Sequence, residues 1–380
     1  MNDAIVIVAA GRSALARSPK GSFKELRPDD LAAAVLRGVL ERAPNLDLQL
    51  IDDVILGCAM PELEQGMDVA RVAALRAGLP QSVAGLTLNR FCASGLEAIA
   101  TAAAKIAAGQ ASFILAGGVE SMTRVPFMGE TLRTNGSLPA ETWLGMGDSV
   151  ERVADEENIT RAQADAFALR SQQRAAAAQA TGKFDSEIIP ITLPDGTIVS
   201  RDEGIRAETT LEGLGNLKTP FLEGGVITAG NASQRSDGAA AVLLTTATLA
   251  AHYGLTPLAR FVGYATAAVD PVHFGIAPAS AIPKLLTRTG ITLDQIDLIE
   301  FNEAFAAQAL ASQNHFPLDW DRVNVNGGAI ALGHPLGATG ARQTVTLLHE
   351  AQRRGARYGM VTMCAALGMG AAGLFEFLAP

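Results

Sequence analysis

Short apolar runs alternate with segments of helical spacing near both ends of the chain. Residues 5–9 form an apolar run typical of a buried strand, and residues 30–42 then place apolar side chains on one face of a helix. Another strand is expected at residues 51–56. This alternation of strand and helix predicts an α/β fold, in which a largely parallel sheet carries helices on its faces.

The same pattern occurs twice. Residues 50–56, LIDDVIL, resemble residues 295–301, QIDLIEF. In each copy a strand, a helical segment and another strand follow, with strands expected at residues 86–89 and 113–118 in the first copy and at 323–326 and 360–364 in the second. Two copies of one βαβ-rich unit are therefore predicted, one toward each end of the chain.

Residues 121–230 have a different texture. Gly and Pro are scattered through them, a helix is predicted at residues 161–180, and residues 194–196 form a polar turn. We interpret this part as an inserted, loop-rich segment. Ligand contacts are common in such segments when a rigid scaffold carries them.

Composition and charge narrow the function classes. The 380 residues are 48% hydrophobic and 18% charged, which suits a globular protein of two or three domains at roughly 100 to 200 residues each. The net charge of −9 argues against nucleic acid as a partner. Any anionic ligand must therefore be bound by local basic residues, because the protein has no general positive field. No apolar run approaches the roughly 20 residues of a membrane span, so no membrane insertion is expected.

The three cysteines are Cys58, Cys92 and Cys364. Their odd number and wide spacing argue against a disulfide framework and for a reducing, cytoplasmic environment. The first ten residues contain no Lys or Arg, unlike the start of a secretory signal. No close spacing of Cys and His suggests zinc, so no metal site is expected.

Cys92 lies between a predicted strand and a helix expected at residues 98–108. Its sulfur would therefore lie at a helix N-terminus, where the helix dipole stabilises a thiolate and lowers the pKa of the thiol. The alternative is that Cys92 is a small buried hydrophobic residue.

Three further residues occupy comparable places. His334 lies in a glycine-dense turn at residues 326–337, which suits a general base, although a turn histidine at a helix cap fits equally well. Cys364 ends a predicted strand and Asn302 follows one; a structural cysteine and a helix cap are the alternatives. The repeat places all of them, with Cys92, at the carboxyl ends of strands, where sites form in open α/β sheets.

The sequence resembles the thiolases along essentially its whole length. Residues 89–99, 302–308 and 324–342 resemble the three family signatures, and residues 226–241 resemble the family's cofactor-binding stretch. The resemblance implies a thiolase fold of two similar βαβαβαββ halves in five layers (αβαβα) with an inserted loop domain. The implied domains are an N-terminal half at 1–120 to which 231–257 return, a loop domain binding coenzyme A at 121–230, and a C-terminal half at 258–380.

The resemblance also implies roles for single residues. Cys92 would be the nucleophile, His334 the base that activates it, and Cys364 the acid and base at the α-carbon of the substrate. Asn302 would hold a water that, with His334, receives the thioester oxyanion, while the backbone N–H groups of Cys92 and Ala366 would form a second oxyanion hole. The implied coenzyme A contacts are Arg206, Leu217, Phe221, Ala229, Ser233, Met146, Phe274 and Phe305. From the residues alone, Arg206 could equally be a solvated loop arginine.

The implied activity is thiolytic cleavage of a 3-ketoacyl-CoA by coenzyme A through an acyl-Cys92 intermediate, reversible as a Claisen condensation. Coenzyme A is then a co-substrate and no cofactor is bound permanently. The partners are acyl-CoA and coenzyme A, and the resemblance implies a homodimer or homotetramer that acts in fatty acid metabolism, including β-oxidation.

Two departures from the family pattern affect this interpretation. Ala366 stands where a glycine is usual, which would cause strain if that position had a positive φ. Gly145 stands where biosynthetic members carry a histidine, and the loop at residues 123–143 is short; both favour a degradative thiolase over a biosynthetic acetyl-CoA acetyltransferase making acetoacetyl-CoA. Two rivals remain: a condensing enzyme acting on acyl carrier protein, with Asn302 in place of its second histidine, and a catalytically weak thiolase-like acyl-CoA-binding protein, which Ala366 supports.

Overall fold

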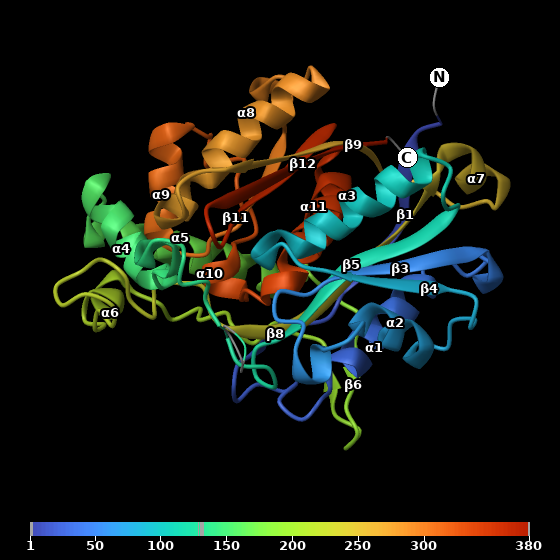
Figure 1. Ribbon diagram of the computed structural model, residues 1–380, viewed down its shortest axis with the longest axis horizontal. Coiled ribbons are helices and arrows are strands. Elements are labelled where there is room, and N and C mark those ends of the chain that lie inside the picture. The colour runs from blue at the N-terminus through green and yellow to red at the C-terminus, as the bar shows by residue number, and fades with distance from the viewer. Residues whose placement is uncertain (1–2, 128, 130–132, 379–380) are drawn as a thin grey trace.

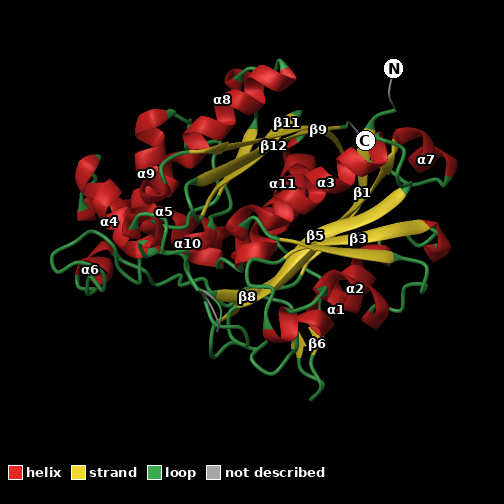
Figure 2. Cartoon of the chain, in the orientation of Figure 1, coloured by secondary structure: helices red, strands yellow, loops and turns green. Residues whose placement is uncertain are grey.

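The computed structural model describes residues 3–127, 129 and 133–378. One long sheet of ten strands dominates it (Figures 1 and 2). The strands of this sheet are β1 (Ile5–Arg12), β2 (Ala16–Arg17), β3 (Ile51–Gly57), β4 (Ala84–Leu88), β5 (Phe113–Ser121), β8 (Ser236–Thr246), β9 (Ala259–Ala268), β10 (Leu298–Phe301), β11 (Tyr358–Ala365) and β12 (Met369–Phe377). A separate pair consists of β6 (Ile191–Thr192) and β7 (Ile198–Val199).

Helices pack against both faces of this sheet and against one another. They are α1 (Pro28–Leu40), α2 (Val69–Arg76), α3 (Ser94–Ala107), α4 (Met146–Glu156), α5 (Arg161–Ala180), α6 (Leu211–Gly215), α7 (Ala247–His252), α8 (Ala277–Thr289), α9 (Ala306–His315), α10 (Ala329–Leu332) and α11 (Thr339–Arg354). The α/β class predicted from the alternating pattern is confirmed.

The strand order shows the repeat directly. It runs β10-β11-β12-β9-β1-β8-β5-β3-β4, with β2 pairing β8 to one side. In the first half β1, β8 and β5 are antiparallel neighbours and β5, β3 and β4 are parallel; in the second half β9, β12 and β11 are antiparallel and β11 and β10 are parallel. The halves meet where β1 pairs β9 over a short stretch.

Five layers result, as the resemblance implied. Helices α1 and α2 cover one face of the first half-sheet and α8 covers the outer face of the second, while α3 and α11 lie between the two half-sheets (Figure 1). These two central helices approach closely because glycines face the contact. A Cβ on Gly95 would lie 2.8 Å from the backbone N of Ala341, and one on Gly340 would lie 2.5 Å from that of Leu96.

One predicted strand is wrong. Residues 323–326 form no strand; Val323 makes a single parallel bridge to Ile299 of β10. The backbone turns at Asn324, which has a φ of 47°. Its side chain replaces the missing strand partner, because Nδ2 donates to the carbonyl oxygen of Phe301 and Oδ1 accepts from the N–H of Phe301, each at 2.8 Å.

The inserted segment folds against this scaffold. Its longest helix, α5, begins at a capping box formed by Thr160 and Gln163 and has the bounds predicted from the sequence. The segment is joined to the sheet by Arg12, whose buried guanidinium is paired with Glu187 at 2.7 Å and with Asp202 at 2.7 Å.

Candidate active site

Cys92 lies at a sharp turn between a strand and a central helix. After β4 the chain forms a 3₁₀ turn at Phe91–Ala93 and then enters α3. Two side chains stabilise the turn: Asn89 Oδ1 accepts from the N–H of Phe91 at 2.7 Å, and Ser94 Oγ accepts from the N–H of Arg90 at 2.8 Å. The Cys92 side chain is left in the molecular interior with 1% exposure.

His334 reaches Cys92 from the equivalent position of the second half. It follows α10 and Gly333, which has a φ of 117° and whose Cβ would lie 2.3 Å from Ser236 Oγ, so only glycine fits there. The His334 N–H donates to the carbonyl oxygen of Gln234 at 3.0 Å. The imidazole Nε2 lies 3.3 Å from Cys92 Sγ.

The hydrogen bonds of Thr339 define the tautomer of this histidine. The single hydroxyl proton of Thr339 is donated to the carbonyl oxygen of Pro335 at 2.9 Å. His334 Nδ1, 2.6 Å from the same hydroxyl oxygen, must therefore donate its own proton. Nε2 is left with a lone pair directed toward the thiol, which is the arrangement that a general base requires.

Burial changes the titration of both groups. Loss of solvent, reinforced by the charge of Glu120, raises the pKa of Cys92 to about 12. Loss of solvent, reinforced by Arg342, lowers the pKa of His334 to about 3. The expectation of a lowered thiol pKa is therefore wrong: the pKa of Cys92 is raised, and loss of solvent is the largest cause. The resting pair is a neutral thiol beside a neutral imidazole.

Asn302 and Cys364 adjoin this pair. Asn302 Nδ2 lies 3.3 Å from His334 Nε2, and Asn302 Oδ1 is buried with no hydrogen-bond partner among the described residues. Cys364, near the end of β11, has 0% exposure; desolvation, followed by the nearby Cys92, raises its thiol pKa well above the usual value. An asparagine thus occupies the place where the rival condensing enzyme would need a second histidine.

The turn after Cys364 departs from the expectation made for Ala366. The three residues between β11 and β12 include Leu367 with a φ of 61° and Gly368 with a φ of 79°, whereas Ala366 has no positive φ. The backbone strain therefore falls on Leu367, one residue further along the chain.

A cavity of about 610 Å³ opens onto His334. Five of the residues expected to contact coenzyme A line it: Met146, Phe221, Ala229, Ser233 and Phe305. The other three do not.

Arg206 and Leu217 are exposed, and Phe274 is buried in an apolar cluster with Cys364. Gly145 also lines the cavity, but the short loop expected at residues 123–143 includes 128 and 130–132, which lie outside the described residues.

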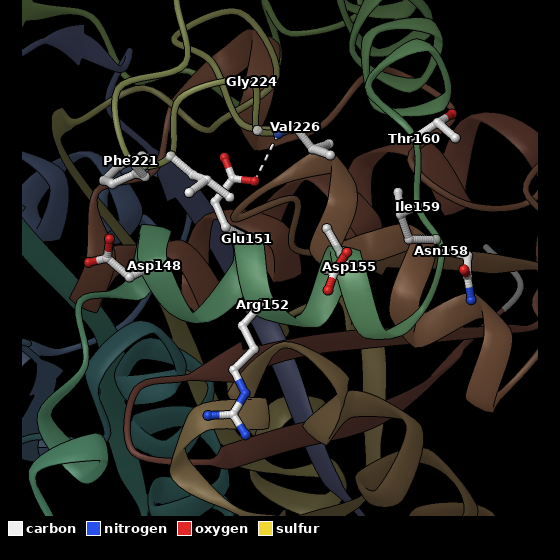
Figure 3. A pocket seen from close by; sticks show the side chains of 13 residues that line it. Asp148, Glu151, Arg152, Asp155, Asn158, Ile159, Thr160, Phe221, Gly224 and Val226 are labelled. Carbon is white, nitrogen blue, oxygen red and sulfur yellow. Dashed lines mark hydrogen bonds between the residues drawn. The ribbon is translucent and has the colours of Figure 1, made fainter.

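A second cavity, of about 710 Å³, lies along α4 (Figure 3). Its wall includes Asp148, Glu151 and Asp155, and Figure 3 shows Glu151 accepting a hydrogen bond from the N–H of Val226. Neither Cys92 nor His334 lines it. Its three carboxylates outnumber Arg152, the basic residue of the same wall, and would repel the phosphates of an anionic ligand, so the smaller cavity is the better candidate for acyl-CoA.

Two residues near the site were not predicted from the sequence. Thr339 is hidden among the small residues that open α11, and no motif distinguishes it. Glu120 could have been noticed, since it is a carboxylate in the otherwise apolar strand β5. Within residues 3–127, 129 and 133–378, no cluster of His, Cys, Asp or Glu could hold a metal ion, and no helix is long and apolar enough to cross a membrane.

A buried thiol in contact with a neutral imidazole, brought together by two α/β halves, is suited to carrying an acyl group on sulfur, as in an acyltransferase. Comparison with known families gives the particular one. Residues 5–248 match the family described as "Thiolase, N-terminal domain" and residues 255–377 match "Thiolase, C-terminal domain". The chain belongs to the thiolase family.

Relatives are similar along nearly the whole chain. A 3-ketoacyl-CoA thiolase of Bacillus subtilis (strain 168) is 46% identical, with 98% of each chain covered. A 3-oxoadipyl-CoA/3-oxo-5,6-dehydrosuberyl-CoA thiolase of Escherichia coli (strain K12) is 47% identical, with 94% of this chain and 95% of the relative covered. The crystal structure of the Bacillus anthracis acetyl-CoA acetyltransferase has a TM-score of 0.91 and 40% identity, with both chains fully covered.

Proposed function

We propose that this thiolase cleaves 3-ketoacyl-CoA with coenzyme A through an acyl group on Cys92. The observation that carries the proposal is the 3.3 Å contact between His334 Nε2 and Cys92 Sγ, with Nδ1 occupied by Thr339. A neutral histidine held in this tautomer can remove the thiol proton while the sulfur attacks the 3-keto carbon.

The remaining steps balance with the thiols present. Attack of the Cys92 sulfur on C3 places a negative charge on the keto oxygen. When the carbonyl double bond forms again, the bond between C2 and C3 breaks and Cys92 keeps the acyl group. Cys364 gives its proton to C2 of the departing acetyl-CoA enolate. Its thiolate then deprotonates coenzyme A, whose sulfur attacks the acyl group, and protonated His334 returns its proton to the leaving Cys92 sulfur.

Preset donors would stabilise the two oxyanions. We propose that the thioester oxyanion accepts hydrogen bonds from His334 and from a water held by Asn302. The unpartnered Oδ1 of Asn302 can accept a hydrogen bond from that water. The backbone N–H groups of Cys92 and Ala366 would face the keto oxygen. Donors of this kind are worth about 3 to 4 kcal/mol each in measured oxyanion holes.

Residues 121–230 would act as the loop domain for coenzyme A. Met146 and Phe221 from this segment line the 610 Å³ cavity, and Ala229 and Ser233 line it at the junction with β8. The proposed roles of Arg206 and Leu217 require the cofactor to extend beyond the cavity lining, whereas Phe274 would act from the buried cluster against which Met146 and Phe305 of the lining pack. Coenzyme A enters as co-substrate, and no group is proposed to stay bound between turnovers.

The degradative direction is supported by Gly145 in the cavity wall and by the names of the curated relatives. The similar Bacillus anthracis structure is that of an acetyl-CoA acetyltransferase, which favours the other candidate. Thiolysis measured over a series of 3-ketoacyl chain lengths distinguishes the two, because a dedicated acetoacetyl-CoA synthase should lose activity on longer chains. β-Oxidation would follow from activity on the longer chains.

The direct test is consumption of acetoacetyl-CoA in the presence of free coenzyme A. Wild type should form acetyl-CoA, and Cys92→Ala should abolish the reaction while leaving binding of the thioester intact. If wild type binds acetoacetyl-CoA and forms no acetyl-CoA, the protein is the acyl-CoA-binding homologue that the Ala366 departure allowed.

We also propose a homodimer or homotetramer in the cytoplasm. The end strand β4 of the sheet and its neighbour α2 leave Leu86, Val72 and Leu75 exposed, and an uncovered apolar sheet edge invites pairing with another chain. Light scattering coupled to size-exclusion chromatography should give twice or four times the mass of one chain. A monomer at micromolar concentration would contradict this assignment.

A further inference from the structure

One charge stands out in the cavity that reaches His334. Arg235 is the only Arg, Lys, Asp or Glu in the described lining; the other lining residues are apolar or neutral, and burial keeps His334 neutral. A lone cation in a largely apolar wall is a recognition element for an anionic group of the ligand.

The backbone directs Arg235 toward the reacting end of the cavity. Arg235 and His334 form a parallel β-bridge, so their side chains leave the two backbones on the same face. Bridged backbones lie about 4.8 Å apart, which brings the guanidinium within reach of a group bound beside the imidazole. Met122 and Leu336, which line the same cavity, pack with Cys92 in one apolar cluster.

The guanidinium of Arg235 is also uncommitted. Within the described part of the chain its side chain makes no hydrogen bond or ion pair, and only its carbonyl oxygen is used, by the N–H of Ser18 at 3.0 Å. The buried arginines of this protein behave differently, since Arg12 and Arg342 are both paired with carboxylates. Arg235 differs because it is exposed in the cavity wall, so its guanidinium is solvated and open to an anionic ligand.

We propose that Arg235 binds a carboxylate at the far end of the acyl chain, so that the preferred substrates are short 3-oxoacyl-CoA thioesters of dicarboxylic acids. A guanidinium and a carboxylate form a two-pronged hydrogen-bonded pair, which gives orientation as well as affinity. This inference rests on the thiolase activity proposed above.

The phosphates of coenzyme A are the other anions that could meet this side chain. They are separated from the reacting sulfur by the whole pantetheine arm. The backbone of Arg235 is bridged to that of His334, next to the cluster around Cys92, where the acyl carbons must be during the reaction. The acyl carboxylate therefore fits the position better than a phosphate does.

The test compares 3-oxoadipyl-CoA with 3-oxohexanoyl-CoA, which has the same chain length without the carboxylate. Arg235→Leu should lower kcat/KM for 3-oxoadipyl-CoA by about 10- to 100-fold and leave 3-oxohexanoyl-CoA unchanged or improved. Arg235→Lys should retain part of the preference. Arg17→Leu is the matched control, because Arg17 is exposed, is paired in register with Ser236 and does not line the cavity.

Other outcomes overturn the inference. Equal losses on both substrates would place Arg235 against the coenzyme A portion, and no loss on either would make it a solvated side chain. Wild-type activity on 3-oxohexanoyl-CoA without activity on 3-oxoadipyl-CoA would refute the substrate class and leave the thiolase function standing.

A binding measurement separates the two proposals. Adipyl-CoA and hexanoyl-CoA have no 3-keto group and cannot be cleaved. If wild type cleaves no 3-oxoacyl-CoA, the proposed function fails, yet Arg235→Leu should still weaken calorimetric binding of adipyl-CoA about 10-fold or more and spare hexanoyl-CoA. Equal binding of adipyl-CoA by both proteins would refute the role of Arg235.

Discussion

At the scale of single residues, Cys92 and His334 form a neutral thiol–imidazole pair, not a thiolate–imidazolium ion pair, before substrate binds. Cys92 and His334 are both buried, and each side chain is held in its uncharged form by the lack of solvent. The histidine tautomer is fixed by Thr339, so the base is oriented before substrate arrives. The sequence singled out Cys92, His334, Cys364 and Asn302 as candidates, because their residue types and their positions at strand ends can be read from it. It could not identify Thr339, whose hydrogen bond to His334 is formed only in the fold, and it did not place Arg235 in the wall of the cavity.

The lowered pKa of His334 gives a prediction for the pH profile. An ordinary histidine base becomes protonated below about pH 6.5 and loses activity there. Because burial lowers the His334 pKa to about 3, the base stays neutral, and kcat/KM for thiolysis should show no acidic decline near pH 6.5. The measurement is kcat/KM against pH with circular dichroism to follow folding. A decline centred near pH 6.5 with the fold intact would contradict the neutral pair.

A second prediction concerns the turn after Cys364. Leu367 adopts a left-handed φ of 61° while 38% exposed, which costs about 1 to 2 kcal/mol for a side chain that buries little surface. Leu367→Gly should therefore raise the thermal unfolding midpoint.

The matched variant is Ala366→Gly. Since Ala366 has no positive φ, added chain freedom should lower stability by about 0.5 to 1 kcal/mol. Thermal unfolding of both variants tests these two predictions. If Ala366→Gly raised the unfolding midpoint, the strain would lie at Ala366 and not at Leu367.

At the scale of elements, one buried carboxylate joins the segments that flank the site. Glu120 of β5 accepts hydrogen bonds from the N–H groups of Ala59 and Gly337, both at 2.7 Å, and from Gln65 Nε2 at 2.8 Å. Ala59 packs with Cys92, and Gly337 follows His334 by three residues. Glu120 is therefore a positioning residue, which connects the two halves at the point where their reactive side chains meet.

Glu120→Gln should disturb this junction without unfolding the chain. The amide replaces one acceptor with a donor, so at least one buried N–H loses its partner at about 1 to 3 kcal/mol. We expect a lower unfolding midpoint and a lower kcat with little change in KM, because the pair is misaligned while the cavity remains. Glu41→Gln, at an exposed position after α1, is the control. A KM increase with normal kcat would assign Glu120 to substrate binding instead.

The local sequence pattern was sufficient to predict some helices and strands but not others. Helix α5 has its predicted bounds because its capping box and its Ala-rich composition favour a helix locally. Residues 323–326 have an apolar alternation that suits a strand, yet Asn324 uses its side chain to pair with Phe301. The Asn324 side chain thus takes the place of a strand's backbone hydrogen bonds. This is a tertiary contact, which the periodicity of the sequence cannot predict.

At the scale of the whole molecule, the repeat visible in the sequence became two half-sheets in which β1, β8, β5 and β3 correspond in order to β9, β12, β11 and β10, while β4 has no counterpart strand among the described residues. What the pattern did not predict is how the inserted segment is fastened to them. Arg12 of β1, Glu187 and Asp202 form a fully buried ion-pair cluster between the sheet and that segment. The three residues are separated by up to 190 positions, and no local signal pairs them.

Removing the cation of this cluster should be costly. Arg12→Ala leaves two carboxylates buried without a counter-charge, which typically costs about 3 to 5 kcal/mol. We expect a large fall in the unfolding midpoint and greater susceptibility of the inserted segment to limited proteolysis. Arg152→Ala, which removes an exposed pair with Glu156, should change neither. Similar behaviour of the two variants would mean that the cluster does not fasten the segment.

The central claim is that one sulfur, in contact with one imidazole, carries the acyl group. Wild type mixed with acetoacetyl-CoA in the absence of free coenzyme A, quenched in acid and analysed by peptide mass spectrometry, tests it most directly. The account predicts one acetyl group on Cys92, and none on Cys58 or Cys364, with the label strongly reduced in His334→Ala. An acetyl group on Cys364, or acetyl-CoA formed without any labelled cysteine, would contradict it.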